Sequence, residues 1–293
     1  FIKEAIPGLE SVVEHHVNGT RYNLKMDEND GLISGGAEHV QLTWMDAKVG
    51  DYVVTPRQGK AVEISALWYS FLKTLAEFKK IAGEKDGSKY EAMAEKTKAG
   101  FQAFWNEKRG CLYDVINEDG SKDDSVRPNQ LMALSLEADL LDRAQQEAAL
   151  KIIEAELLTP FGLRSISPKS PQYLKKYGEG KASANQYDRD RTYHQGTVWA
   201  WLLGPWVDAR MNVLGENVEN RTGINAHLAL LLHHHITQEA GLGSISEIFD
   251  GDAPHKARGC IAQAWSVAEL LRVFYEYPEL QGLTRKELAM SAG

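Results

Sequence analysis

Cysteine is nearly absent from this sequence, since Cys111 and Cys260 are the only two in 293 residues. Two thiols in so long a chain do not make a disulfide framework, and neither lies in a cluster with metal-ligand spacing. This scarcity favours a reducing compartment, so we predict a cytoplasmic protein. No signal peptide is visible at the start. Because the segment after Phe1 already has a helical pattern, we expect the chain to begin inside a larger domain, which leaves an upstream signal peptide open.

Several other features are missing. No apolar run approaches the roughly 18 residues that span a membrane. There is no glycine-rich loop with phosphate- or dinucleotide-binding spacing, and no Gly-x-Ser-x-Gly elbow. The 33 basic and 41 acidic residues give a formal net charge of −8, which disfavours nucleic acid and anionic membranes as partners. A neutral sugar would be compatible with this charge.

Apolar residues recur at helical spacing over most of the chain, between loops rich in glycine, proline, aspartate and serine. In the segment 60–81, for example, Val62, Ala66 and Tyr69 share one face, which predicts a buried stripe. Strand signals are few and short, and Asp119-Gly120 is a hairpin turn signal. The predicted helices are 2–18, 60–81, 89–106, 128–140, 143–157, 193–214, 218–239 and 261–277, with a short one at 284–289, and the predicted strands are 22–26 and 111–116.

The loops between the predicted helices differ in character. Some are short and plain, such as 83–88, whereas 26–59, 159–191 and 241–259 are long and carry Trp, Arg, His, Asp and Glu. In an array of helical hairpins, long functional loops gather on one face. We therefore predict an all-α ring of helical hairpins that forms a single domain over residues 1–293, with short β-hairpin arms in its loops.

Two loops place carboxylates among aromatic and small polar residues, as glycoside hydrolysis requires. Asp46 follows Thr43-Trp44-Met45, and Glu247 precedes Ile248-Phe249-Asp250 about 200 residues later. Acidic residues in these loops could also have non-catalytic roles. Asp46 could cap a helix or lie in a surface loop, and Asp250 and Asp252 could be solvated loop acids.

Polar residues and tryptophans recur at the starts of predicted helices that follow the rich loops. An arginine at a helix start opposes the helix dipole, which favours a role for Arg127 in binding a polar ligand. For Trp201 we favour core packing. His233, His234 and His235 are adjacent on a predicted helix, so their side chains point in different directions and cannot form one metal site. We therefore predict no metal, and we predict no other cofactor. The candidate binding residues are Trp44, Glu63, Trp68, Arg127, Asn129, Gln130, His194, Gln195, Trp199, Gln263 and Trp265.

Seven segments carry a family resemblance, in this order: 41–47 (QLTWMDA), 54–60 (VTPRQGK), 62–69 (VEISALWY), 127–130 (RPNQ), 159–165 (TPFGLRS), 193–199 (YHQGTVW) and 246–251 (SEIFDG). From about Gly19 to Tyr277 the chain resembles the amylo-α-1,6-glucosidase domain of glycogen debranching enzymes in its prokaryotic form. The resemblance implies a glucoamylase-like (α/α)6 toroid. It also implies hydrolysis of α-1,6-linked branch glucose in an α-glucan with inversion, with Asp46 as the acid and Glu247 as the base.

A complete toroid needs about twelve helices, and the pattern predicts about eight or nine. We therefore expect a domain truncated at its N-terminus, inactive without the upstream helices, whose uncovered hairpin faces favour a homo-oligomer or partner association. Two alternatives stay open at this point. One is a glucoamylase- or trehalase-like α-glucosidase on the same toroid, and the other is a non-catalytic glucan-binding fragment.

Overall fold

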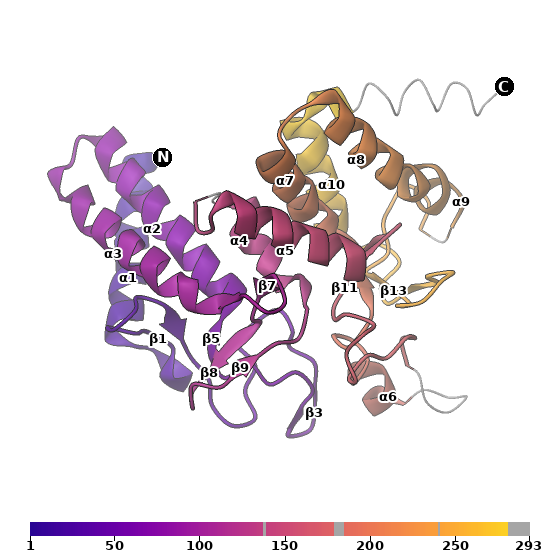
Figure 1. Ribbon diagram of the computed structural model, residues 1–293, viewed down its shortest axis with the longest axis horizontal. Coiled ribbons are helices and arrows are strands. Elements are labelled where there is room, and N and C mark those ends of the chain that lie inside the picture. The colour runs from indigo at the N-terminus through magenta and orange to yellow at the C-terminus, as the bar shows by residue number, and fades with distance from the viewer. Residues whose placement is uncertain (137–138, 179–184, 240, 281–293) are drawn as a thin grey trace.

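The computed structural model describes residues 1–136, 139–178, 185–239 and 241–280. The predicted short helix at 284–289 lies outside these ranges. Helices dominate the described part (Figure 1). They are α1 (Ile2–Asn18), α2 (Val62–Ala82), α3 (Ser88–Phe101), α4 (Met132–Ser135), α5 (Arg143–Glu156), α6 (Gln186–Asp190), α7 (Leu203–Leu214), α8 (Val218–Leu230), α9 (Ile236–Gln238) and α10 (Ala264–Glu276).

Neighbouring helices pack against one another along the chain of contacts α2, α4, α7 and α10. Helix α2 packs against α1, α3 and α4, and α4 packs against α7. Helix α7 then packs against α5, α8 and α10, so α2, α4, α7 and α10 follow one another as neighbours. Their buried apolar residues form one continuous core, which includes Leu72, Leu134, Trp206 and Val273. This succession of packed hairpins is the arrangement that the sequence pattern predicts.

Short strands in the loops tie distant segments together. A sheet in the order β5-β8-β9 joins residues 59–61 to residues 115–123. A second sheet, in the order β10-β11-β12-β13-β14, joins residues 158–164, 198–199 and 248–258. The strands are β1 (Lys25–Met26), β2 (Ile33–Ser34), β3 (Lys48–Val49), β4 (Tyr52–Val53), β5 (Gly59–Ala61), β6 (Trp105–Asn106), β7 (Cys111–Leu112), β8 (Val115–Asn117), β9 (Lys122–Asp123), β10 (Leu158–Thr159), β11 (Gly162–Arg164), β12 (Val198–Trp199), β13 (Ile248–Phe249) and β14 (Ala257–Arg258).

Most predicted elements are confirmed. Helix α1 has the predicted bounds, and α2 ends at Gly83, whose left-handed φ of 79° closes it. Asp142 and Gln145 form a capping box at the start of α5. The turn at Asp119-Gly120 lies between β8 and β9, where the backbone N–H of Gly120 donates to Asn117 over 2.9 Å.

The predicted helix at 193–214 is wrong over its first half. Residues 198–199 form strand β12 between β11 and β13, a 3₁₀ turn follows, and helix α7 begins only at Leu203. Gly196 has a φ of +144° and lies so close to Leu174 that a Cβ would be 2.2 Å from its carbonyl oxygen. Pairing with neighbouring strands therefore overrides the helical spacing of this segment.

Other predicted helices are shorter than expected. Helix α3 ends at Phe101, and residues 105–106 turn into strand β6. The helix predicted at 128–140 is a 3₁₀ turn, Pro128–Leu131, followed by the single turn of α4. The helix at 218–239 is interrupted by the π-helical segment Leu231–His235.

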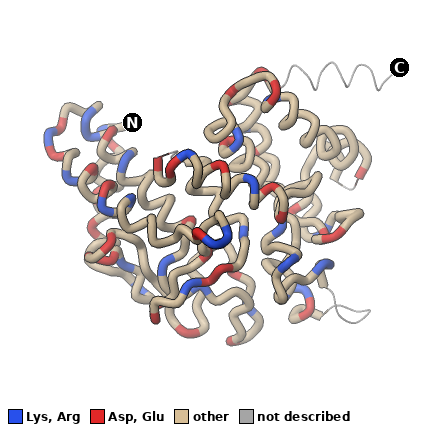
Figure 2. The backbone as a smooth tube through the Cα atoms, in the orientation of Figure 1, with Lys and Arg blue, Asp and Glu red and all other residues tan. Residues whose placement is uncertain are grey.

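Charges of both signs are interspersed along the described backbone (Figure 2). Lys60, for instance, bridges Asp27 and Asp30, at 2.6 and 2.5 Å, across the loop before β2. Among the helices described, none is long and apolar enough to cross a membrane.

Gly59 provides a test of how strands β5 and β8 fit together. Its φ is +116°, and a Cβ there would lie 2.3 Å from the carbonyl oxygen of Ile116. We expect Gly59→Ala to lower the free energy of unfolding by roughly 2–5 kcal/mol, from backbone strain and overpacking. Gly8→Ala is the matched control, because its Cβ would meet nothing within 4 Å in helix α1 and should stabilise by about 0.5–1 kcal/mol. Urea unfolding measures both, and equal effects would contradict the prediction.

Candidate active site

The segment that carries Asp46 is anchored by the two residues before it. The indole N–H of Trp44 donates to Asn129 Oδ1 over 2.7 Å. Met45 is completely buried, with its sulfur 3.7 Å from Arg127 Nη1 and 3.5 Å from Asn129 Nδ2. Asp46 itself stays exposed. The buried contacts of Trp44 and Met45 therefore hold the loop, while the Asp46 carboxylate remains accessible to solvent.

The carboxyl group of Asp46 has a perturbed acidity. Although solvent reaches the side chain, surrounding protein atoms partly desolvate it, and this raises its pKa above the usual aspartate value. A raised pKa keeps a larger fraction of the group protonated at a given pH. This is the property that a proton donor needs.

Glu247 immediately precedes strand β13, and both of its carboxylate oxygens accept hydrogen bonds. The hydroxyl of Tyr193 donates to Oε1, and the backbone N–H of Cys260 donates to Oε2 over 2.8 Å. The backbone N–H of Glu247 also donates to the Cys260 carbonyl over 2.9 Å, which extends the pairing of β13 with β14 by one residue. The sheet thus fixes both the backbone and the side chain of Glu247.

An aromatic cluster lies between these two segments. The ring centroids of Trp44 and Trp199 are 5.3 Å apart, and those of Trp199 and Tyr193 are 4.9 Å apart. Trp44 also meets Trp201 edge-on at 5.2 Å, and Trp201 stacks on Trp265 at 5.2 Å. We define the aromatic cluster as Trp44, Tyr193, His194, Trp199, Trp201 and Trp265. It connects the loop of Asp46 to the residue that holds Glu247.

His194 is fully buried inside the aromatic cluster. It stacks on Trp199 with centroids 5.3 Å apart and meets Trp44 edge-on at 5.2 Å. Burial first, and then the positive charges of Arg127 and Arg57, lower its pKa to about 3, so the imidazole is neutral near pH 7. Neither ring nitrogen has a hydrogen-bond partner among the described residues.

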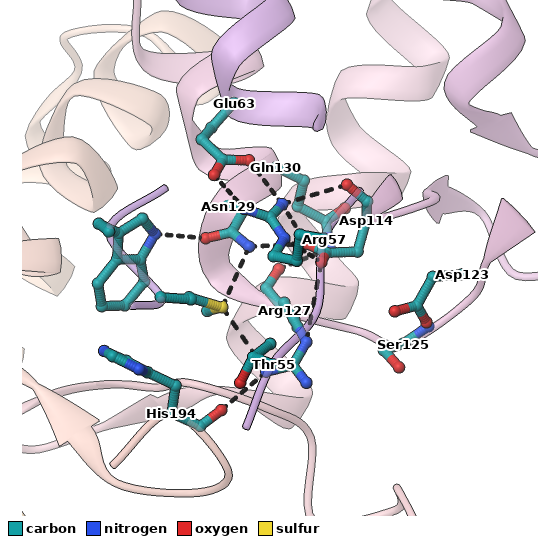
Figure 3. A network of polar contacts seen from close by, with 12 residues as sticks. Thr55, Arg57, Glu63, Asp114, Asp123, Ser125, Arg127, Asn129, Gln130 and His194 are labelled. Atoms are coloured by element: carbon teal, nitrogen blue, oxygen red, sulfur yellow. Dashed lines mark hydrogen bonds and ion pairs between the residues drawn. The ribbon is translucent and has the colours of Figure 1, made fainter. Parts of the chain in front are cut away.

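A buried polar network supports the aromatic cluster (Figure 3). Arg57 donates to both oxygens of Glu63, to Asp114 Oδ2 over 2.8 Å and to Asp114 Oδ1 over 3.1 Å. Asn129 Nδ2 donates to Asp114 Oδ1 over 2.7 Å while its own oxygen accepts from Trp44. The two carboxylates raise the pKa of Arg57 despite its burial. The network connects helix α2, the turn before β8 and the loop of Asp46.

Arg127 connects the remaining segments. Its guanidinium donates to the carbonyl oxygens of Ser165 and His194, over 3.1 and 2.8 Å, and to Gln195 Oε1 over 3.0 Å. Gln195 in turn donates to the Val54 carbonyl oxygen over 3.3 Å. Arg127 is 2% exposed, so the structure gives it a framework role that its position at a helix start did not indicate.

The other acidic residues of the late loop are structural. Asp250 is buried and accepts from Arg258 over 3.2 and 3.1 Å and from the backbone N–H of Tyr177 over 2.9 Å. Asp252 accepts from the Tyr173 hydroxyl over 2.7 Å. Both carboxylates are therefore occupied in holding the loop. Among the three acids at 247–252, Glu247 is the one whose donors come from the aromatic cluster and the end of the sheet.

The structure brings some of the predicted site residues together and not others. Trp44, Asn129, His194, Gln195, Trp199 and Trp265 lie in the aromatic cluster or bond directly to its framework. Glu63 is 4% exposed and ion-paired with Arg57. Gln130 accepts from the Leu112 backbone N–H over 3.1 Å, and Gln263 precedes helix α10. Trp68 packs instead against His16 and Phe71, with centroids 5.5 and 5.8 Å away.

Sequence reasoning missed three residues that the geometry makes important: Arg57, Asp114 and Tyr193. Arg57 and Tyr193 lie inside segments that carry the family resemblance, which was an available signal. Asp114 lies inside the predicted strand 111–116, and nothing in its local sequence marks it. Trp201 packs against the hydrophobic core, as predicted, and its ring also contacts Trp44 and Trp265. In the described ranges, no three His, Cys, Asp or Glu side chains gather as a metal site would require.

Comparison with known proteins gives a consistent result. A family model described as amylo-alpha-1,6-glucosidase matches residues 1–272. A glycogen debranching enzyme from Saccharomyces cerevisiae is 25% identical over 318 residues, which cover 92% of this chain and 21% of that protein. A periplasmic trehalase from Salmonella newport is 33% identical over 131 residues, which cover 44% of this chain and 23% of that protein. The chain thus spans about a fifth of the length of these relatives.

Similarity to a solved structure identifies the fold. A GH63 mannosylglycerate hydrolase from Thermus thermophilus aligns with a TM-score of 0.52 at 15% identity, covering 74% of this chain and 45% of that one. Its family has the (α/α)6 toroid fold. The predicted fold class, an all-α (α/α)6 toroid with short strands in its loops, is therefore confirmed.

Asp114 tests the buried network. It accepts from Arg57 and from Asn129, and its side chain is 1% exposed. We expect Asp114→Ala to lower the free energy of unfolding by about 3–5 kcal/mol, because it leaves a buried guanidinium incompletely paired. Glu118→Ala, at the exposed tip of the same hairpin, should change it by no more than about 0.5 kcal/mol. Urea unfolding compares the two, and a small effect at both positions would show that the network adds little stability.

Proposed function

The chain belongs to the amylo-alpha-1,6-glucosidase family, and we propose that it hydrolyses the α-1,6 bond of a glucose attached at a glycogen branch point. Glycoside hydrolysis of this kind uses one carboxyl group to protonate the leaving oxygen and a second to activate water. We assign the first role to Asp46 and the second to Glu247. An α-glucan such as glycogen or a limit dextrin is the proposed substrate.

One observation supports this proposal above the others. Ring contacts run without a break from Trp44, two residues before Asp46, through Trp199 to Tyr193, which bonds Glu247. Two carboxylates about 200 residues apart in sequence are thereby attached to one aromatic cluster. Aromatic faces with neighbouring polar groups are the usual lining of a sugar site, and Trp265 keeps 37% of its surface exposed.

The environments of the two carboxyl groups suit a division of roles. The raised pKa of Asp46 favours the protonated form that a general acid needs. As pH rises through that pKa, the acid form is lost, so Asp46 would set the alkaline limb of the activity profile. Glu247 accepts two hydrogen bonds, as an ionised carboxylate can, and suits the base.

A trehalase-like activity is the second candidate, because the matched trehalase is more similar over its shorter aligned region. Comparing a branched limit dextrin with a linear maltooligosaccharide and trehalose separates these activities. In the complete protein that contains this chain, we expect glucose release from the limit dextrin only. Oligosaccharide binding without turnover of any substrate would instead support a non-catalytic glucan-binding role.

Substitution of the two carboxyl groups tests their roles. In the complete protein that contains this chain, we expect Asp46→Asn and Glu247→Gln each to lower kcat on limit dextrin about 10²–10⁴-fold, which is the usual worth of one positioned acid or base. The urea unfolding midpoint should stay nearly constant for Asp46→Asn, because Asp46 is exposed. For Glu247→Gln it should fall only slightly, because the amide keeps an acceptor oxygen for Tyr193 and loses the single hydrogen bond from the Cys260 N–H, worth about 1 kcal/mol. Full activity of Glu247→Gln, combined with a folded but inactive Asp250→Asn, would move the base role to Asp250.

The stereochemistry of the product is a further expectation. An inverting pair has its carboxyl groups about 6.5–9.5 Å apart, so that a water fits on the side opposite the leaving oxygen. We expect the first product to be β-glucose. Following the anomeric proton by NMR during the first minutes of reaction measures it. Initial α-glucose would contradict inversion and recast Glu247 as a nucleophile, as in a retaining pair about 5–5.5 Å apart.

A further inference from the structure

The structure assigns a positioning role to Tyr193, and we propose that its hydroxyl fixes the orientation of the Glu247 carboxylate during hydrolysis. The role rests on the proposed function, because it matters only if Glu247 is the base. Tyr193 is not among the residues predicted from sequence. Its hydroxyl donates to Oε1 of Glu247 across 54 residues of sequence.

Tyr193 is itself held firmly. Its ring packs against Trp199 and His194, with centroids 4.9 and 5.0 Å away, and against Tyr177 at 5.8 Å. Its carbonyl oxygen accepts from the indole N–H of Trp199 over 3.2 Å and from the hydroxyl of Thr197. Neither the ring nor the backbone is free to move away from Glu247, so the hydroxyl is a preorganised donor.

The other oxygen of Glu247 is fixed from the opposite side. The Cys260 backbone N–H donates to Oε2, and a Cβ on Gly259 would lie 2.5 Å from that same atom. The carboxylate therefore sits between a side-chain donor on one segment and a closely fitted backbone on another. Loss of the hydrogen bond from either Tyr193 or the Cys260 N–H would let the Glu247 carboxylate rotate.

Other titratable groups lie close to Glu247. The pKa of Tyr177 is raised, chiefly by burial, and the charge of Glu247 contributes to the shift. Arg258 lies on the neighbouring strand, but its guanidinium is paired with Asp250. Among the described groups, Tyr193 is thus the side chain that donates directly to Glu247.

Orientation matters for a general base because one lone pair must point at the attacking water. A misplacement of about 1 Å in a reacting group can cost about 10²-fold in rate. Loss of the Tyr193 hydroxyl should therefore lower kcat with little change in KM.

Tyr193→Phe is the first test, assayed on a branched limit dextrin. We expect kcat to fall about 10- to 100-fold and KM to change by less than about threefold. Tyr173→Phe is the matched control, because it removes a similar bond, 2.7 Å to Asp252, from the same region without touching Glu247. Equal losses in both variants, or unchanged kcat in Tyr193→Phe, would overturn the proposal.

A second pair of variants approaches Glu247 from the other side. Gly259→Ala should push the carboxylate away and lower kcat by a similar factor. Gly243→Ala is its control, because that glycine has a comparable φ, +79° against +68°, but nothing within 4 Å of its Cβ. If the control loses as much activity as Gly259→Ala, loop strain rather than carboxylate placement is responsible, and the proposal fails.

These outcomes are distinct from failure of the proposed function. If Glu247→Gln retains activity, Glu247 is not the base and the proposed function is wrong at that residue. If Glu247→Gln is inactive while Tyr193→Phe resembles the unmodified protein, the base assignment stands and only the positioning role of Tyr193 is lost.

Discussion

The buried ion pair between Arg57 and its two carboxylates is the constraint on which the rest of the site depends. A guanidinium removed from water must be paired, and both Glu63 and Asp114 pair with it. Glu63 is at the start of helix α2, and Asp114 lies just before strand β8. The ion pair therefore fixes a helix and a hairpin arm relative to each other. Through Asn129, the same network holds the indole of Trp44.

The sheet from β10 to β14 holds the other half of the site. Val198 pairs with Phe249, and Trp199 pairs with Ile248. This register places the segment of Tyr193 next to the segment of Glu247, although they are far apart in sequence. Because side chains alternate along strands, a slip by one residue would turn Trp199 away from its ring contacts. Short strands thus set a precise geometry inside a helical protein.

The two supports differ in kind, and the aromatic cluster joins them. One is an electrostatic network in the protein interior, and the other is a ladder of backbone hydrogen bonds. The proposed acid projects from a loop attached to the first, where solvent can reach it. The proposed base is part of the second, where both of its oxygens are fixed. These environments suit the proposed reaction. An accessible, partly desolvated acid can protonate the leaving oxygen, and a base held in one orientation can activate a water molecule.

The sequence by itself determined the helical class, several helix positions, the β8–β9 turn and the loops that carry the proposed site. These follow from apolar spacing, capping residues and turn residues such as Asp142 and Gly120, which act locally. Tertiary structure alone decided that Val198 and Trp199 form a strand, because partners on both sides outweigh local preference. It also decided that Arg127 and Glu63 serve the framework, and that Tyr193 meets Glu247. Such pairings join residues far apart in the chain, and no local pattern encodes which distant group will satisfy a buried charge or hydroxyl.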